Sequence, residues 1–105
     1  MLGILKKLFS SGPATDYKQL VQNGAIILDV RTAGEYAGGH IKGSINIPVQ
    51  ELGNNKLSAL PKGKAIITCC ASGMRSASAR NILMQRGYSE VYNGGGWAGL
   101  KSKLS

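Results

Sequence analysis

The chain of 105 residues has few of the residues that build metal centres, disulfide frameworks or membrane spans. Its two cysteines, Cys69 and Cys70, are adjacent, so they cannot form an ordinary structural disulfide. One histidine leaves too few soft ligands for a zinc site, and we expect neither a metal nor a cofactor. This use of cysteine indicates a reducing compartment, here expected to be the cytoplasm, or chemistry at a thiol.

No apolar run is long enough to cross a bilayer. Residues 1–14 form a short N-terminal segment in which Lys6 and Lys7 interrupt the apolar residues, unlike a signal peptide. The sequence leaves open whether this segment packs on the domain or acts as a weak anchor. Residues 15–105 are long enough to form one domain with its own core.

The chain has little negative charge, with five acidic residues against 13 lysines and arginines and a net charge of +8. A basic chain raises the possibility of nucleic-acid binding. However, the lysines are scattered, and basic residues are not interleaved with aromatic ones. We therefore expect no nucleic-acid partner, and a basic field that attracts small anionic substrates.

Two continuous apolar runs, residues 25–30 and 64–69, are typical of strands buried on both faces of a sheet. Because helical segments alternate with them, we predict an α/β fold with helices on both faces of a central, mostly parallel sheet. Further strands are expected at 45–47 and 89–92, and helices at 16–23, 33–37, 76–86 and 97–104. Thr15 is expected to cap the first helix, and a Thr32–Glu35 capping box the second. We also expect a turn at 94–96, and a helix or turn within 49–62 whose buried residues are Leu52, Leu57, Leu60 and Pro61.

The loop from Cys70 to Arg75 carries the strongest functional signal. Cys70 ends a predicted strand and leads into a helix N-terminus, whose free N–H groups and dipole favour a thiolate. Gly73 permits an unusual backbone conformation, and Arg75 adds a permanent charge that can contact an anionic substrate or hold the loop. We expect Cys70 to be the nucleophile, and a substrate to be held by the residues after it: Ala71, Ser72, Gly73, Met74 and Arg75.

With four residues between its cysteine and arginine, this loop resembles the rhodanese active-site loop, Cys-x-x-Gly-x-Arg. A second motif, Asp29-Val30-Arg31 followed by Gly39-His40-Ile41, is similar to the other signature of that family. The resemblance covers residues 15 to 103 and implies a rhodanese-like sulfurtransferase. It implies that sulfane sulfur passes from thiosulfate or a persulfide through a Cys70 persulfide to a thiol or cyanide. A sulfur-carrier protein would be a fitting partner.

Four residues outside the loop have roles that the sequence alone leaves open. Asp29 and Arg31 match the family motif, either as a buried charge network that supports the loop or as substrate contacts. His40 is expected to make a structural hydrogen bond, because an acidified thiol needs no general base. Trp97 is expected in the core or in the wall of a pocket.

Two other functions compete with sulfur transfer. Counted from Cys69, five residues precede Arg75, which resembles the phosphate-binding loop of cysteine phosphatases of the Cdc25-like type. Those enzymes usually have a histidine where this chain has Thr68, and the side chain of Cys69 should point to the opposite face of its strand. The third possibility is a non-catalytic interaction domain of the rhodanese fold, although many such domains lack the cysteine that this chain retains.

Overall fold

The computed structural model describes residues 15–53, 57 and 60–105, so the N-terminal segment and part of the uncertain stretch 49–62 lie outside the described residues. Four parallel strands form one sheet in the order β2-β1-β3-β4. They are β1 (Ile26–Asp29), β2 (Ile45–Asn46), β3 (Ile66–Cys70) and β4 (Val91–Gly96). The prediction of an α/β fold with a largely parallel sheet is confirmed.

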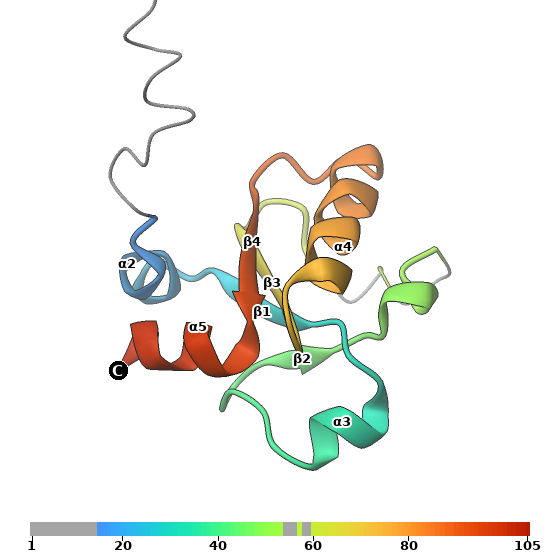
Figure 1. The fold of residues 1–105 in the computed structure, drawn as a ribbon. Helices are drawn as coiled ribbons and strands as arrows, with labels where there is room; N and C mark the ends of the chain where they lie inside the picture. Colours follow the sequence, from blue (N-terminus) through green and yellow to red (C-terminus); the bar gives the residue numbers. More distant parts are fainter. Residues whose placement is uncertain (1–14, 54–56, 58–59) are drawn as a thin grey trace, which may run out of the picture.

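Helices cover both faces of the sheet (Figure 1). The two helices α2 (Tyr17–Gln22) and α5 (Trp97–Leu104) pack on one face, and α4 (Met74–Gln85) with the short 3-10 helix η1 (Val49–Glu51) lies on the other. The remaining helix, α3 (Ala33–Ala37), lies beyond the carboxyl ends of the strands. This arrangement leaves the carboxyl edge of the sheet bordered by α3 and by the start of α4.

The core has two halves, one on each side of the sheet. Leu28, Ile66 and Leu83 belong to the half beneath α4, whereas Ile67 and Leu100 belong to the half beneath α5. Successive residues of β3 alternate between these halves, as the period of a strand requires. Cys69 packs in the α5 half and Cys70 in the α4 half, and both are fully buried. The expectation that the two thiols point to opposite faces is confirmed.

Two predicted details are wrong. The cap of α2 is Asp16 and not Thr15, because the Asp16 carboxylate accepts the Gln19 N–H at 3.0 Å. Pro61 is exposed, because Leu52 and Leu60 are the residues of this stretch that enter the core, where they are 0% and 3% exposed.

The predicted turn at residues 94–96 is also wrong, because these glycines form the end of β4. A Cβ atom on Gly94 would lie 2.8 Å from the Thr68 carbonyl oxygen, and one on Gly96 would lie 2.9 Å from the carbonyl oxygen of Ala71. The glycines therefore permit backbone to pack directly on backbone. In this way the end of β4 supports the loop that follows β3.

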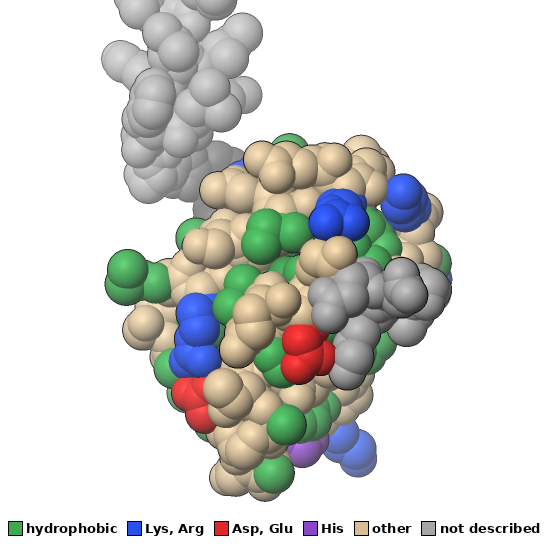
Figure 2. All heavy atoms as spheres, turned by 90° about the vertical axis from the view of Figure 1, so that its right-hand side faces the viewer, with side chains coloured by type: hydrophobic (Ala, Val, Ile, Leu, Met, Phe, Trp, Pro, Cys, Tyr) green, Lys and Arg blue, Asp and Glu red, His purple; other side chains and the backbone are tan. Residues whose placement is uncertain are grey.

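Basic side chains are dispersed over the face shown in Figure 2. The described ones lie in separate places, one of them directly beside an acidic side chain. Within the described part of the chain, no helix is long and apolar enough to cross a membrane.

Candidate active site at the Cys70 loop

The direction of the chain connections changes between β1 and β3, at the carboxyl ends of these strands. The connection after β1 runs through α3 to β2, and the connection after β3 runs through α4 to β4 on the opposite side. Parallel sheets bind ligands where neighbouring connections diverge in this way. Cys70 is the last residue of β3, and Asp29 ends β1 directly beside Cys69 in the strand register. The sheet therefore brings the two sequence motifs to one place.

The Cys70 sulfur accepts hydrogen bonds from the backbone of its own loop. The N–H groups of Gly73 and Ser76 lie 2.9 and 3.3 Å from the Sγ atom. Gly73 precedes the first residue of α4 with a φ of 109°, a left-handed conformation that a side chain would strain. No side-chain oxygen caps this helix. The sulfur thus takes the position of the helix-capping acceptor, at the positive end of the dipole.

The pKa values of the two cysteines are shifted in opposite directions. Burial alone favours the neutral thiol of Cys70, but hydrogen bonds from Ser76, and then from Gly73 and Ser72, outweigh it and lower the Cys70 pKa. Burial, followed by the negative charge of Asp29, raises the pKa of Cys69 to about 12. The thiolate therefore forms more readily at Cys70 than at an ordinary cysteine, and it is strongly disfavoured at Cys69.

Ser76 and Asn93 are parts of the site that sequence reasoning missed. The buried Ser76 hydroxyl lies 2.5 Å from the Asn93 side-chain oxygen and 3.0 Å from the Gly73 carbonyl. Asn93 is held in turn by the Gly95 N–H at 2.9 Å. Ser76 directly follows Arg75, the last residue of the loop motif, and this position was the available signal. Asn93 had none, because it lies 23 positions after Cys70 in the sequence.

Replacing Ser76 with alanine is expected to shift the pH midpoint of Cys70 alkylation upward. The substitution removes the hydroxyl that helps to stabilise the thiolate, while the Ser76 backbone N–H remains. The rate of iodoacetamide labelling against pH measures this midpoint. Ser78→Ala is the matched control, since Ser78 lies on the exposed face of the same helix. An unchanged midpoint in Ser76→Ala would show that the hydroxyl does not act on the thiolate.

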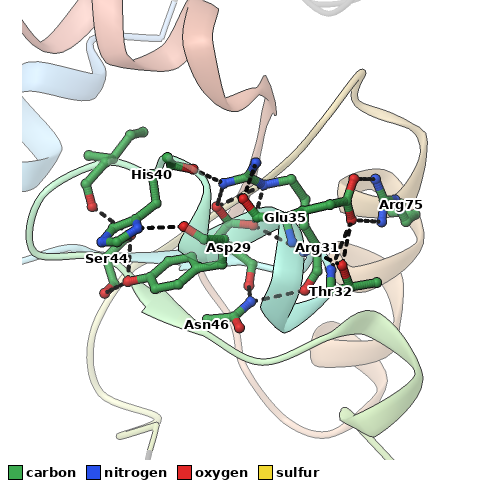
Figure 3. A network of polar contacts seen from close by, with 11 residues as sticks. Asp29, Arg31, Thr32, Glu35, His40, Ser44, Asn46 and Arg75 are labelled. Carbon is green, nitrogen blue, oxygen red and sulfur yellow. Dashed lines mark hydrogen bonds and ion pairs between the residues drawn. The ribbon is translucent and has the colours of Figure 1, made fainter.

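Arg75 is paired with Glu35, a partner 40 residues away that sequence reasoning did not assign to it. The two guanidinium nitrogens lie 2.7 and 3.0 Å from the two carboxylate oxygens. Glu35 also forms the predicted capping box of α3 with Thr32, which is confirmed. Figure 3 shows this pair at one end of a polar network. The ion pair therefore fastens the end of the Cys70 loop to α3.

Asp29 and Arg31 lie at the buried centre of the same network (Figure 3). The Arg31 guanidinium binds the Asp29 carboxylate at 2.7 Å and the Gly39 carbonyl at 2.7 Å. It also lies 4.7 Å from the centre of the half-buried Trp97 ring. With these contacts made, the geometry favours the structural interpretation of Asp29 and Arg31 over substrate contact.

His40 makes a structural contact, as expected. Its Nδ1 atom lies 2.7 Å from the Tyr36 carbonyl oxygen, and its ring stacks on the Tyr36 ring with 3.7 Å between the centres. The Tyr36 hydroxyl donates to the Ser44 carbonyl at 2.6 Å. These contacts hold the segment between α3 and β2.

The other loop residues differ in exposure. Ala71, Ser72 and Met74 are exposed, and Met74 is 81% accessible. Gly73 lies against Gly95, so that a Cβ on Gly73 would be 3.5 Å from the Gly95 Cα. The six residues from Cys70 to Arg75 thus run from the end of β3 to the first turn of α4, with the Cys70 sulfur buried and Met74 exposed.

The fold and this loop define an α/β protein with a cysteine of lowered pKa at the carboxyl end of a parallel sheet. Residues 13–103 match the family described as rhodanese-like domain, and the chain belongs to that family. The resemblance drawn from the two sequence motifs is thereby confirmed.

Relatives with known names support sulfur transfer at the level of the family. The chain is 37% identical over 70 residues to the thiosulfate sulfurtransferase PspE of Escherichia coli K12, covering 66% of this chain and 67% of PspE. It is 36% identical over 69 residues to the uncharacterized protein YqhL of Bacillus subtilis 168, covering 66% of this chain and 54% of YqhL. A solved structure described as rhodanese with anions from E. coli has a TM-score of 0.67 and 32% identity, covering 72% of this chain and 91% of that one.

Proposed function

We propose that this protein is a sulfurtransferase that carries sulfane sulfur as a persulfide on Cys70. The observation that carries the proposal is the Cys70 Sγ atom, which accepts the N–H groups of Gly73 and Ser76 at 2.9 and 3.3 Å. Such an arrangement stabilises a sulfur anion through fixed dipoles, in the manner of an oxyanion hole. The donor is thiosulfate or a persulfide, and the acceptor is a thiol or cyanide.

The reaction has two steps. The Cys70 thiolate attacks the outer sulfur of the donor, and the donor's S–S bond breaks with its electron pair leaving on sulfite or a thiolate. The backbone N–H groups of residues 71 to 75 stabilise the negative charge on the transferred sulfur. A nucleophilic acceptor then attacks this outer sulfur and releases the Cys70 thiolate, which completes a ping-pong cycle. A sulfur-carrier protein would fit as a physiological acceptor.

The loop geometry supports Cys70 rather than Cys69 as the nucleophile. Cys69 is buried on the other face of the sheet, where its thiol stays neutral. The phosphatase interpretation needs Cys69, because the longer loop begins there. The position of Cys69 on the other face of the sheet and its raised pKa therefore weigh against that alternative.

Sulfur transfer and phosphate hydrolysis can be compared directly. The unmodified protein should form thiocyanate from thiosulfate and cyanide, and should hydrolyse p-nitrophenyl phosphate negligibly, because four residues between cysteine and arginine form a cradle sized for one sulfur atom. Phosphatase activity without sulfur transfer would contradict the proposal. Absence of both activities would favour the non-catalytic interaction domain.

A further inference from the structure

Arg75 is the single cation of the Cys70 loop, and its charge is already neutralised. Both nitrogens of its guanidinium end bind the Glu35 carboxylate, and both side chains remain about one third exposed, at 36% and 37%. The Thr32 N–H donates to Glu35 at 3.0 Å and fixes it in this position. Hydrogen bonds from Arg75 and then from Thr32 lower the pKa of Glu35 to about 2, so it is anionic throughout any assay near neutrality.

The charge at the loop matters because the sulfur-loading step brings anions together. When thiosulfate, a dianion, meets the Cys70 thiolate, three negative charges enter one site. The thiolate forms the new S–S bond, the old S–S bond breaks, and sulfite leaves with its electron pair and two charges. A thiosulfonate, R–SO₂–S⁻, reacts in the same way but releases a sulfinate with one charge. The two donors therefore differ by one unit of charge that the site must tolerate.

We propose that Glu35 determines donor specificity by neutralising Arg75, so that the site favours singly charged, carbon-bearing sulfane donors over doubly charged thiosulfate. This inference rests on the proposed sulfurtransferase function. Arg75 directly precedes Ser76, whose N–H lies 3.3 Å from the Cys70 sulfur, so its side chain extends from the same turn of backbone that binds the sulfur. The pKa of Arg75 is raised mainly by Glu35 and also by the charge of Cys70. Glu35 thus competes with the reacting anions for the charge of Arg75.

Thiosulfate and methanethiosulfonate form a matched pair of probes, since a methyl group replaces one charged oxygen. The unmodified protein should use methanethiosulfonate with the higher kcat/KM, measured as thiocyanate formation at low ionic strength. Glu35→Gln should raise kcat/KM for thiosulfate about fivefold and that for methanethiosulfonate less than about twofold, because it frees the Arg75 charge. Glutamine also satisfies the capping box, so α3 keeps its N-terminal cap.

Two further variants separate the proposed effect from a general change in charge. Glu90→Gln removes the same charge from an exposed residue before the start of β4, at the far edge of the sheet, and should leave the donor ratio unchanged. Adding Arg75→Gln to Glu35→Gln should abolish the gain, and added salt should reduce it in the single variant. A gain that persists without Arg75 would overturn the inference.

The remaining outcomes are also distinct. Equal losses with both donors in Glu35→Gln would show that Glu35 only braces the loop, which overturns the inference on specificity. Failure of both donors to load Cys70 of the unmodified protein, measured by intact mass, would instead contradict the proposed function. Loading by both donors with an unchanged ratio in Glu35→Gln would overturn the inference alone.

Discussion

Replacing Cys70 with serine is expected to abolish the mass increase of about 32 Da that thiosulfate should add to the protein, together with all thiocyanate formation. The added mass is one sulfur atom, and the Cys70 thiolate is the group that would bond to it. A serine hydroxyl is not ionised near neutral pH and cannot form a persulfide. Intact-protein mass spectrometry after thiosulfate treatment measures the loading, and peptide mapping places it.

Cys69→Ala is the matched control for this experiment. Alanine suits the apolar surroundings of Cys69, which include Ile27, Ile67 and Leu100. We expect this variant to retain most of the loading, because the Cys69 thiol lies on the other face of the sheet and has a pKa of about 12. Sulfur found on Cys69, or loading that survives in Cys70→Ser, would refute the assignment of the nucleophile.

Inserting one glycine between Ser72 and Gly73 is expected to reduce sulfur transfer on the order of a hundredfold or more, the loss typical of removing one preorganised donor. The insertion would displace Gly73 N–H from its position 2.9 Å from the Cys70 sulfur. It would also shift the loop against the glycines of β4, where a Cβ on Gly96 would already come within 2.9 Å of the Ala71 carbonyl. The measurement is kcat/KM for thiosulfate.

The control for this insertion is a glycine placed between Lys62 and Gly63. These residues form an exposed turn before the start of β3, at the amino ends of the strands. Such turns tolerate insertions because no core packing depends on them. We expect this variant to keep its activity. A loop insertion as active as this control would show that the spacing of the cradle does not govern the reaction.

The elements that the sequence predicted well are those encoded by neighbouring residues. The buried runs gave β1 and β3, and the Thr32–Glu35 spacing gave the capping box of α3. The Cys70 loop could be found because its nucleophile, its Gly73 and its helix N-terminus are contiguous. In each case the physical cause lies within a few residues of the feature.

The features that could not be predicted depend on contacts between distant segments. Glu35 had a complete local explanation in its capping box, and nothing in the sequence shows that its carboxylate also binds Arg75. Three glycines in a row favour a turn when considered alone, whereas the closeness of Thr68 to Gly94 requires them in a strand. In such cases the space left by another segment, and not the local preference of the residues, determines the backbone structure.

Cys70 contributes one atom to two processes, since its sulfur both accepts the N–H groups at the start of α4 and is the proposed site of sulfur loading. Conformational order in the first turn of α4 and occupancy by sulfur are therefore thermodynamically linked. By reciprocity, sulfur loading would alter the stability of that turn, and any change that stabilises the turn in one form would shift the equilibrium between loaded and free protein. Affinity for sulfur can thus be tuned from within the helix, by residues that never touch the donor.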